Sequence, residues 1–441
     1  MKNIHFVICL LFCFTNALAQ KPLTLEAAMQ LAVQHNYDLQ NQQLRIDLVD
    51  KDLEKIRARR QPTVGLNGDL RTNPILQSSI IPGEAFMQPG QGEAENRRVQ
   101  FGTVFNLTFA VDATYQLYNP TYRTDIEINR TENALETATL RKNTLDVKLE
   151  AATAYYDLLL QQTQVTLAEN RLRRAEDLLA VAQTRRDAGA LLPVDLQRSE
   201  LDVQNAQTLL DQAQNARRRS RLNLARLLGT QPEDLALPAG NALQISPDTI
   251  VSPEVNRNLV EGRYEIQEIQ QQLAINQLQV RREDKAYLPT VELYGNLSAQ
   301  HLSNDLAVWD DWFPFMFVGL RASLPIFDGN LKARNKETYQ LQSQINRNSL
   351  ARLREDLTYE LQSAAIDLEN AISQLQDARR NLQSARDILA TDQKRYAEGA
   401  LLFSEFRNTE FSVREAESNF LAAGQNYFLA KLSWMRASGK L

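Results

Sequence analysis

An internal duplication runs through nearly the whole chain and restricts its architecture more than any other feature. Each copy has the order helix, strand, strand, very long helix, helix, and the two copies align almost without gaps. The matching pairs include Tyr37 and Tyr264, Leu39 and Ile266, Pro62 and Pro289, Val64 and Val291, Gly68 and Gly295, Arg185 and Arg395, Gly189 and Gly399, Glu200 and Glu410, and Gly229 and Gly439. We therefore expect one fold adopted twice, in a first repeat at 20–229 and a second at 257–441, joined by a Pro-rich linker at 230–256.

The two copies differ in length only in the loop between their strands. In the first copy this loop holds a Gly- and Pro-rich run from Asn73 to Gly92. Insertions are tolerated best at exposed loop tips. We therefore expect the variable loops to lie at one end of the molecule.

Residues 1–19 have the features of a secretory signal. Lys2 precedes an apolar stretch at 6–14, and Ala-Leu-Ala at 17–19 forms a small-residue cleavage site. Both cysteines, Cys9 and Cys13, lie within this segment. The mature chain is therefore expected to have no disulfide, no zinc cluster of the cysteine type and no cysteine for lipid attachment.

The rest of the sequence excludes several other classes of protein. Beyond the signal no apolar run reaches the roughly 18 residues that a membrane-spanning helix needs, so a membrane would have to be entered as strands. The net charge of -5 is spread over interspersed acidic and basic residues, which argues against a nucleic-acid partner because such a partner calls for a basic face.

Two segments read as single very long helices. Neither 121–188 nor 330–398 contains a Gly or a Pro, and both are rich in Ala, Leu, Gln, Arg and Glu. At 1.5 Å per residue each helix would be roughly 100 Å long, and it would need partner helices along its whole length. Large and small apolar residues alternate at heptad spacing in both, which is typical of coiled-coil packing. The seam of the second is Leu361, Ala364, Leu368, Ala371, Leu375, Ala378, Leu382, Ala385 and Leu389; that of the first is Ala154, Leu158, Val165, Ala168, Leu172, Ala175 and Leu179, interrupted at Gln161.

Each long helix is expected to end in a tight turn and to return as an antiparallel helix, at 194–228 in the first copy and at 404–437 in the second. Gly189 and Gly399 suit the left-handed residue that follows a helix, and Pro193 suits the start of the next helix. Apolar residues stand at both tips, and we expect them either to pack on their own hairpins or to dock another protein. The tip residues are Gly189, Ala190, Leu191, Leu192, Gly399, Ala400, Leu401 and Leu402.

The strand regions, expected as hairpins at 63–117 and 290–326, alternate apolar and polar residues. Val64, Leu66 and Leu70 alternate with polar neighbours, and the same pattern recurs in the other three strands. Four charged residues fall on the polar face: Asp69, Asp112, Glu292 and Arg321. The pattern suits a watery lumen with lipid outside, although a half-buried soluble sheet would show it too.

Aromatic residues gather at the two ends of the strands, as the girdles of a membrane barrel do. Trp309 and Trp312, with Phe313, Phe315 and Phe317, stand at the loop end, and Tyr115, Tyr118, Tyr287 and Phe327 stand at the helix end. Four strands cannot close a barrel, and an open sheet edge cannot face lipid because its backbone groups would stay unpaired. The chain should therefore oligomerise, as a dimer, trimer or tetramer.

The duplicated order of elements, with Arg-x-x-x-Gly at each hairpin tip and an acidic residue six positions after the glycine, resembles the outer-membrane efflux protein family typified by TolC. The resemblance implies a mainly α-helical chain with a β-barrel part, which forms a homotrimer in the outer membrane of a Gram-negative cell. Its twelve-stranded barrel would continue into a periplasmic α-helical tunnel. Such a duct serves a tripartite efflux or type I secretion system, with a periplasmic adaptor protein and an inner-membrane pump of the resistance-nodulation-division or ABC type.

The resemblance also implies a gate where the tunnel ends in the periplasm. By position, Tyr396 resembles the tyrosine of the family's lock, Asp195 its aspartate partner, and Glu405 an acid of the constriction. The chain departs from the family at Leu401, where an arginine usually stands, and at Asn408, where a second acid would lie. The departures predict a weaker lock and a less charged ring. The residue-level alternatives are that Asp195 and Glu405 simply satisfy helix N-termini and that Tyr396 serves hairpin packing.

Enzyme activity is not expected. The only histidines after the signal, His35 and His301, are far apart in sequence, and the motifs of nucleotide-binding loops, zinc proteases and serine hydrolases are absent from the sequence. No cofactor is expected either. The competing class is a secreted periplasmic coiled-coil protein without channel activity, which the long helices alone would allow.

Overall fold

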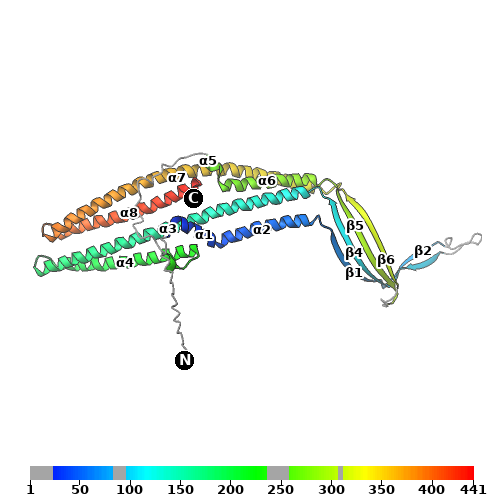
Figure 1. Ribbon diagram of the computed structural model, residues 1–441, viewed down its shortest axis with the longest axis horizontal. Coiled ribbons are helices and arrows are strands. Elements are labelled where there is room, and N and C mark those ends of the chain that lie inside the picture. The colour runs from blue at the N-terminus through cyan, green and yellow to red at the C-terminus, as the bar shows by residue number, and fades with distance from the viewer. Residues whose placement is uncertain (1–22, 83–95, 236–257, 306–310) are drawn as a thin grey trace, which may run out of the picture. The chain divides into compact units, whose positions relative to one another are not determined.

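The computed structural model describes residues 23–82, 96–235, 258–305 and 311–441. The proposed signal with its two cysteines, the proposed girdle residue Trp309, and most of the proposed linker at 230–256 lie outside these residues. In the described part of the chain the fold class predicted from the duplication is confirmed, because the same series of helices and strands occurs twice (Figure 1).

The first copy begins with two helices and continues into its strands and its helical hairpin. Its elements are α1 (Leu25–His35), α2 (Tyr37–Ala58), β1 (Thr63–Thr72), β2 (Gln77–Ile81), β3 (Arg97–Phe101), β4 (Phe105–Tyr118), α3 (Tyr122–Asp187), α4 (Pro193–Leu228) and the 3-10 turn η2 (Pro232–Asp234). The second copy contains α5 (Asn258–Glu261), α6 (Tyr264–Lys285), β5 (Thr290–Ser303), β6 (Trp312–Ser323), α7 (Leu331–Ala397) and α8 (Phe403–Ala437).

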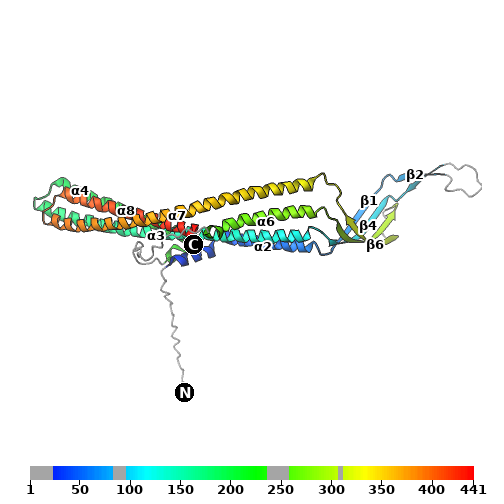
Figure 2. The same cartoon turned by 90° about the horizontal axis from the view of Figure 1, so that it is seen from above.

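The contacts divide the chain into two compact units. One consists of residues 1–43, 138–266 and 351–441, and the other of residues 44–137 and 267–350. The second unit contains the strands, and in it α2 and α6 lie along the first part of α3 (Figure 2). Asn129 of α3 donates to the carbonyl of Val49 at 2.9 Å, and Arg282 of α6 pairs with Asp125 of α3 at 2.7 Å. Helices α3 and α7 each run from one unit into the other.

The main sheet has four strands in the order β1-β4-β5-β6, with every neighbouring pair antiparallel. Strand β4 of the first copy therefore pairs with β5 of the second, and the outer edges of β1 and β6 have no partner strand in the described chain. Pairing through β4 and β5 joins the two copies into one sheet.

The register sorts the side chains of this sheet onto two faces. One face carries Val64, Leu66, Val111, Leu293, Leu297, Val318 and Leu320, and the other carries Asp69, Asp112, Asn296, Glu292 and Arg321. Leu66 is 74% exposed and Leu320 is 69% exposed in the single chain. A contiguous exposed apolar face of this kind marks a surface that meets a partner or a lipid phase.

Two local features differ from the expectation. The insertion of the first copy is not only a loop, because β2 and β3 pair within it as an antiparallel ribbon. Asn36 separates α1 from α2, and its side-chain oxygen accepts a hydrogen bond from the Leu39 amide at 2.9 Å, which suits an asparagine that starts a new helix.

The long helices are confirmed, with 66 residues in α3 and 67 in α7. Leucines of the predicted α7 seam are buried from Leu361 to Leu389. In α3 the seam is buried at Leu158 and Val165, but toward the tip Leu178 is buried in place of the predicted Leu179. A straight helix drifts relative to a strict seven-residue repeat, which accounts for the change of one position.

The first unit has an apolar core where α1, α3 and α4 meet. Ala28, Leu158, Leu224 and Leu228 are fully buried there. No helix of the described chain is both long enough and apolar enough to cross a membrane.

We predict that Gly229→Ala destabilises the first unit more than Gly189→Ala. Both glycines have left-handed backbone angles, with φ of 65° and 71°, which cost an alanine roughly 1–2 kcal/mol. At Gly229 an added Cβ would also lie 2.7 Å from the Cβ of His35, whereas at Gly189 nothing lies within 4 Å. Thermal unfolding in detergent should give the lower midpoint for Gly229→Ala, and equal midpoints would contradict this packing of α4 on α1.

Candidate functional site

The two hairpin tips are built by the same hydrogen-bonded turn. After α3, Gly189 donates to the carbonyl of Arg186 at 2.9 Å and Ala190 donates to that of Arg185 at 2.8 Å. After α7, Gly399 donates to Tyr396 at 3.0 Å and Ala400 to Arg395 at 2.8 Å. Both are Schellman turns, in which a left-handed glycine lets the last carbonyls of a helix find donors. Gly189, Ala190, Gly399 and Ala400 are exposed.

The tip leucines do not all point to solvent. Leu192 is 65% exposed and Leu402 is 66% exposed, and Leu191 is half-buried. Leu401 is only 8% exposed, because it packs in an apolar cluster with Tyr396, Phe403 and Phe406. For Leu401 the packing alternative therefore holds, and this residue offers little surface for docking. The free apolar surface at the tips consists chiefly of Leu192 and Leu402.

Tyr396 lies at the centre of this cluster and is 2% exposed. Its ring stacks on Phe406 with centroids 5.2 Å apart, and burial raises the pKa of its hydroxyl against the opposing effect of Arg185. Arg185 of α3 reaches across to it: the guanidinium lies 4.7 Å from the ring centroid and donates to the Tyr396 carbonyl at 3.2 Å. The contact joins the two hairpins at their tips.

The two proposed gate acids lie in the first turns of their helices. Asp195 of α4 pairs with Arg198 at 3.0 Å, and Glu405 of α8 accepts from the Leu402 amide at 3.3 Å. Asp195 therefore has Arg198 as its partner in the single chain, not Tyr396. Glu405 and Asn408 are exposed. The carboxylate of Glu405 faces solvent.

A buried cluster of charges links the hairpins farther from the tips. Arg174 of α3 lies 3.6 Å from Glu410 and 3.4 Å from Glu417, both on α8, and Arg386 of α7 lies 3.9 Å from Glu417. Burial raises the pKa of the Glu410 carboxyl, and Glu417 adds to the rise, while Arg174, Arg414 and Arg171 oppose it. This cluster was not predicted, since on a charge-rich helix the spacing alone does not separate Arg174 or Glu417 from solvent-facing residues.

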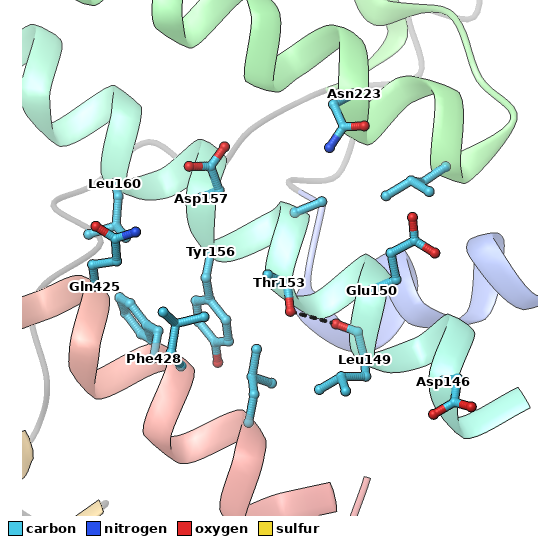
Figure 3. A pocket seen from close by; sticks show the side chains of 14 residues that line it. Asp146, Leu149, Glu150, Thr153, Tyr156, Asp157, Leu160, Asn223, Gln425 and Phe428 are labelled. Atoms are coloured by element: carbon cyan, nitrogen blue, oxygen red, sulfur yellow. Dashed lines mark hydrogen bonds between the residues drawn. The ribbon is translucent and has the colours of Figure 1, made fainter. Parts of the chain in front are cut away.

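A cavity of about 500 Å³ lies between α3, α4 and α8 (Figure 3). Tyr156 of α3 and Phe428 of α8 stack in it with ring centroids 4.1 Å apart, and burial raises the pKa of Tyr156 to about 12. Asp157 accepts a hydrogen bond from Ser220 of α4 at 2.5 Å. These contacts hold α3 between its two neighbours. In the described residues no group of three or more His, Cys, Asp or Glu side chains is placed to hold a metal ion.

The four proposed lumen residues share one face of the sheet and form polar contacts across strands. Asp112 accepts from Asn67 and from Asn296, both at 2.7 Å, and Arg321 pairs with Glu292 at 2.8 Å. Asp69 lies 3.7 Å from Arg71. The face therefore carries charge that is already partly paired within the sheet.

The proposed girdle residues lie at the two ends of the sheet, as far as they are described. Trp312 stacks on Phe109 at the loop end, with centroids 5.8 Å apart, and Tyr118, Tyr287 and Phe327 are exposed at the helix end, where Tyr115 is half-buried. Phe313, Phe315 and Phe317 differ from Trp312, because the register pairs them with Gln300, Ser298 and Asn296 on the polar face.

A family model described as "Outer membrane efflux protein" matches residues 28–230 and 257–441. The chain belongs to the outer membrane efflux protein family. This assignment identifies it as a passive outer-membrane channel, the exit duct of a tripartite efflux system, and not an enzyme.

Solved structures show the same fold. The chain is similar to the MtrE outer membrane channel of Neisseria gonorrhoeae in its open state, with a TM-score of 0.73 and 18% identity over 94% of this chain and 88% of that one. It is also similar to the CmeC outer membrane channel of Campylobacter jejuni, with a TM-score of 0.73 and 15% identity over 94% of this chain and 85% of that one. A third similar structure is the outer membrane protein VceC of Vibrio cholerae, with a TM-score of 0.70 and 16% identity over 94% of this chain and 96% of that one. No curated protein sequence matches the chain.

We predict that Glu410 makes the hairpin pair more stable in mild acid than at neutral pH. Burial raises the pKa of the Glu410 carboxyl in the folded state. The stabilising contribution of Glu410 to the free energy of unfolding is therefore present below the unfolded pKa of about 4.3 and is lost as pH rises through the folded pKa. Glu410→Gln should remove this loss, so the unfolding midpoint of the wild type should fall relative to that of the variant as pH rises. Unfolding midpoints from pH 4.5 to 7.5 measure the difference, with exposed Glu415→Gln as control. Parallel pH profiles would contradict the assignment.

Proposed function

We propose that three copies of this chain form one continuous duct, with a closed barrel in the outer membrane and a tunnel of helices in the periplasm. The observation that supports this proposal is the main sheet, which has one exposed apolar face and, among the described residues, no partner strand at either edge. Strands β1 and β6 run in opposite directions, so β6 of one copy can pair antiparallel with β1 of the next. Closure satisfies every backbone group that lipid would leave unpaired.

The polar face of the sheet would then line the lumen. Asp112 with its two asparagines and the Glu292–Arg321 pair lie on this face, which suits water inside and lipid outside. Family membership supports an outer-membrane location. We propose that residues 1–19 direct export and are removed.

We propose that the hairpin tips form the periplasmic gate and the docking surface. Glu405 is exposed in the first turn of α8, so three copies would form a ring of carboxylates that favours cations. Arg185 and Tyr396 hold the first hairpin against the second in one subunit, in the place where the family lock would use Asp195. The exposed Leu192 and Leu402 would meet a periplasmic adaptor, which in turn meets an inner-membrane pump.

The first test is the single-channel conductance of the purified mature protein in planar bilayers, together with its mass in detergent. We expect a trimer with a small, cation-selective conductance, and Glu405→Gln should lower the preference for K⁺ over Cl⁻ without changing the trimer. Glu415→Gln, on the same helix, is the control. A protein that never inserts into the bilayer would favour the alternative of a secreted coiled-coil protein. Unchanged cation selectivity in Glu405→Gln would exclude Glu405 as the residue that forms the constriction.

A second test addresses the docking surface. Leu192→Asp combined with Leu402→Asp should abolish dye efflux in cells that express the adaptor and pump, because two exposed apolar contacts per subunit are replaced by charge. Trimers and bilayer conductance should stay intact, since neither side chain packs in the hairpin core. Ile75→Asp, at another exposed apolar residue, is the matched control. Normal efflux by the double variant would exclude these leucines from docking.

A further inference from the structure

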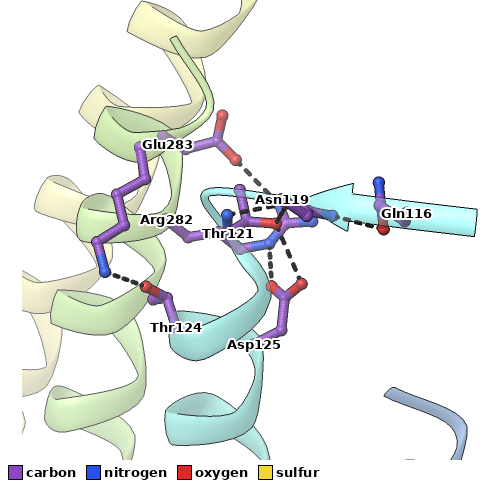
Figure 4. Close-up of polar contacts among 8 residues, drawn as sticks. Gln116, Asn119, Thr121, Thr124, Asp125, Arg282 and Glu283 are labelled. Atoms are coloured by element: carbon purple, nitrogen blue, oxygen red, sulfur yellow. Dashed lines mark hydrogen bonds and ion pairs between the residues drawn. The ribbon is translucent and has the colours of Figure 1, made fainter. Parts of the chain in front are cut away.

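A cavity of about 380 Å³ lies in the second unit, where the strands give way to helices. It is formed by the end of α2, the end of β4, the start of α3 and the end of α6. Figure 4 shows the neighbouring contacts, in which Asn119 and Thr121 shape the turn from β4 into α3. The cavity is lined by Arg60, Gln116, Leu117, Tyr118, Asn119, Pro120, Tyr122, Arg123, Lys285 and Leu288.

The charged residues that line this cavity are all basic: Arg60, Arg123 and Lys285. The Arg60 guanidinium lies over the Tyr122 ring at 5.1 Å, and Lys285 donates one hydrogen bond, to Thr124 at 3.0 Å. In the described part of the chain neither arginine forms an ion pair. The acid in the first turn of α3, Asp125, is already engaged by Arg282 at 2.7 Å (Figure 4). The cavity therefore has an excess of free cationic donors.

An apolar rim adjoins these cations. Leu117, Tyr118 and Leu288 line the cavity and are each about half exposed. A β-bulge between Gln116 and Tyr118 shifts the register so that Tyr118 pairs with Val291, and this places it on the apolar face of the sheet. The cations thus stand at the end of the surface that meets lipid in the proposed duct.

We propose that this cavity binds the headgroup of an anionic phospholipid from the periplasmic leaflet of the outer membrane. The inference rests on the proposed placement of the sheet in that membrane. Arginine forms paired, charge-assisted hydrogen bonds with phosphate oxygens, and an acyl chain can continue along Leu117, Tyr118 and the apolar face. Free phosphate would meet the same donors, but it would gain nothing from the apolar rim, so the geometry favours the lipid.

The test measures lipid retained by the purified, full mature trimer in native mass spectrometry, after exposure to phosphatidylglycerol or to phosphatidylcholine of the same chain length. Each basic residue near an anionic lipid is worth about fivefold in binding, so Arg60→Glu combined with Arg123→Glu should lower phosphatidylglycerol retention by at least roughly twentyfold. Arg60→Lys with Arg123→Lys should keep most of it. Arg141→Glu with Arg347→Glu, two exposed arginines outside the cavity, should change nothing.

Three results would overturn the inference. Equal retention of phosphatidylglycerol and phosphatidylcholine would show that the cavity does not recognise the charge of the headgroup. Equal loss of retention in the Arg60→Glu, Arg123→Glu variant and in the Arg141→Glu, Arg347→Glu variant would show a general effect of net charge. Displacement of the lipid by free glycerophosphate at equal concentration would show that the site binds a free phosphate. Conductance is recorded on the same samples, so a trimer that conducts but retains no lipid contradicts this inference alone, whereas a protein that does not insert contradicts the proposed duct.

Discussion

The rest of the structure depends on how the backbone amide and carbonyl groups at the two edges of the main sheet find hydrogen-bond partners. Within the described residues, strands β1 and β6 each leave one row of amide and carbonyl groups without a partner strand, and lipid offers such groups no partner. The apolar face is exposed at the same time, so neither water nor lipid is a good solvent for the isolated sheet. A second copy is the natural source of the missing bonds, and the family to which the chain belongs uses such assembly.

The helical hairpins present a different problem, which is how two long hairpins are held together in one register. Apolar seams bury the leucines of α7 and the middle of α3 at Leu158 and Val165, and these contacts have little directionality. Between the hairpins the contacts are more specific: the Arg174 cluster, the stack of Tyr156 on Phe428 and the grip of Arg185 on Tyr396. Charged and aromatic contacts depend on geometry, so they define the register of one hairpin against the other.

Much of the fold follows from sequence, because duplication, heptad spacing and strand alternation are periodic signals. The glycines at the tips were predictable for the same reason, since a left-handed residue is required after each long helix. Single-residue fates were less predictable. Leu401 and Leu402 are neighbours of one type, yet one is buried and the other exposed, and only the position of the aromatic cluster decides between them. Likewise, Arg185 and Arg395 are equivalent in the repeat, but one crosses to Tyr396 and the other pairs with Asp392 within its own helix.

The three phenylalanines of β6 give the polar face a dry patch. Phe313, Phe315 and Phe317 stand on alternate positions opposite Gln300, Ser298 and Asn296. In a closed trimer each subunit would place three rings along the wall near the outer mouth. Water would wet that stretch of the lumen poorly, so hydrated ions would cross it at a cost in free energy, whereas apolar molecules would not. The outer part of the lumen would then favour the passage of hydrophobic molecules over that of ions.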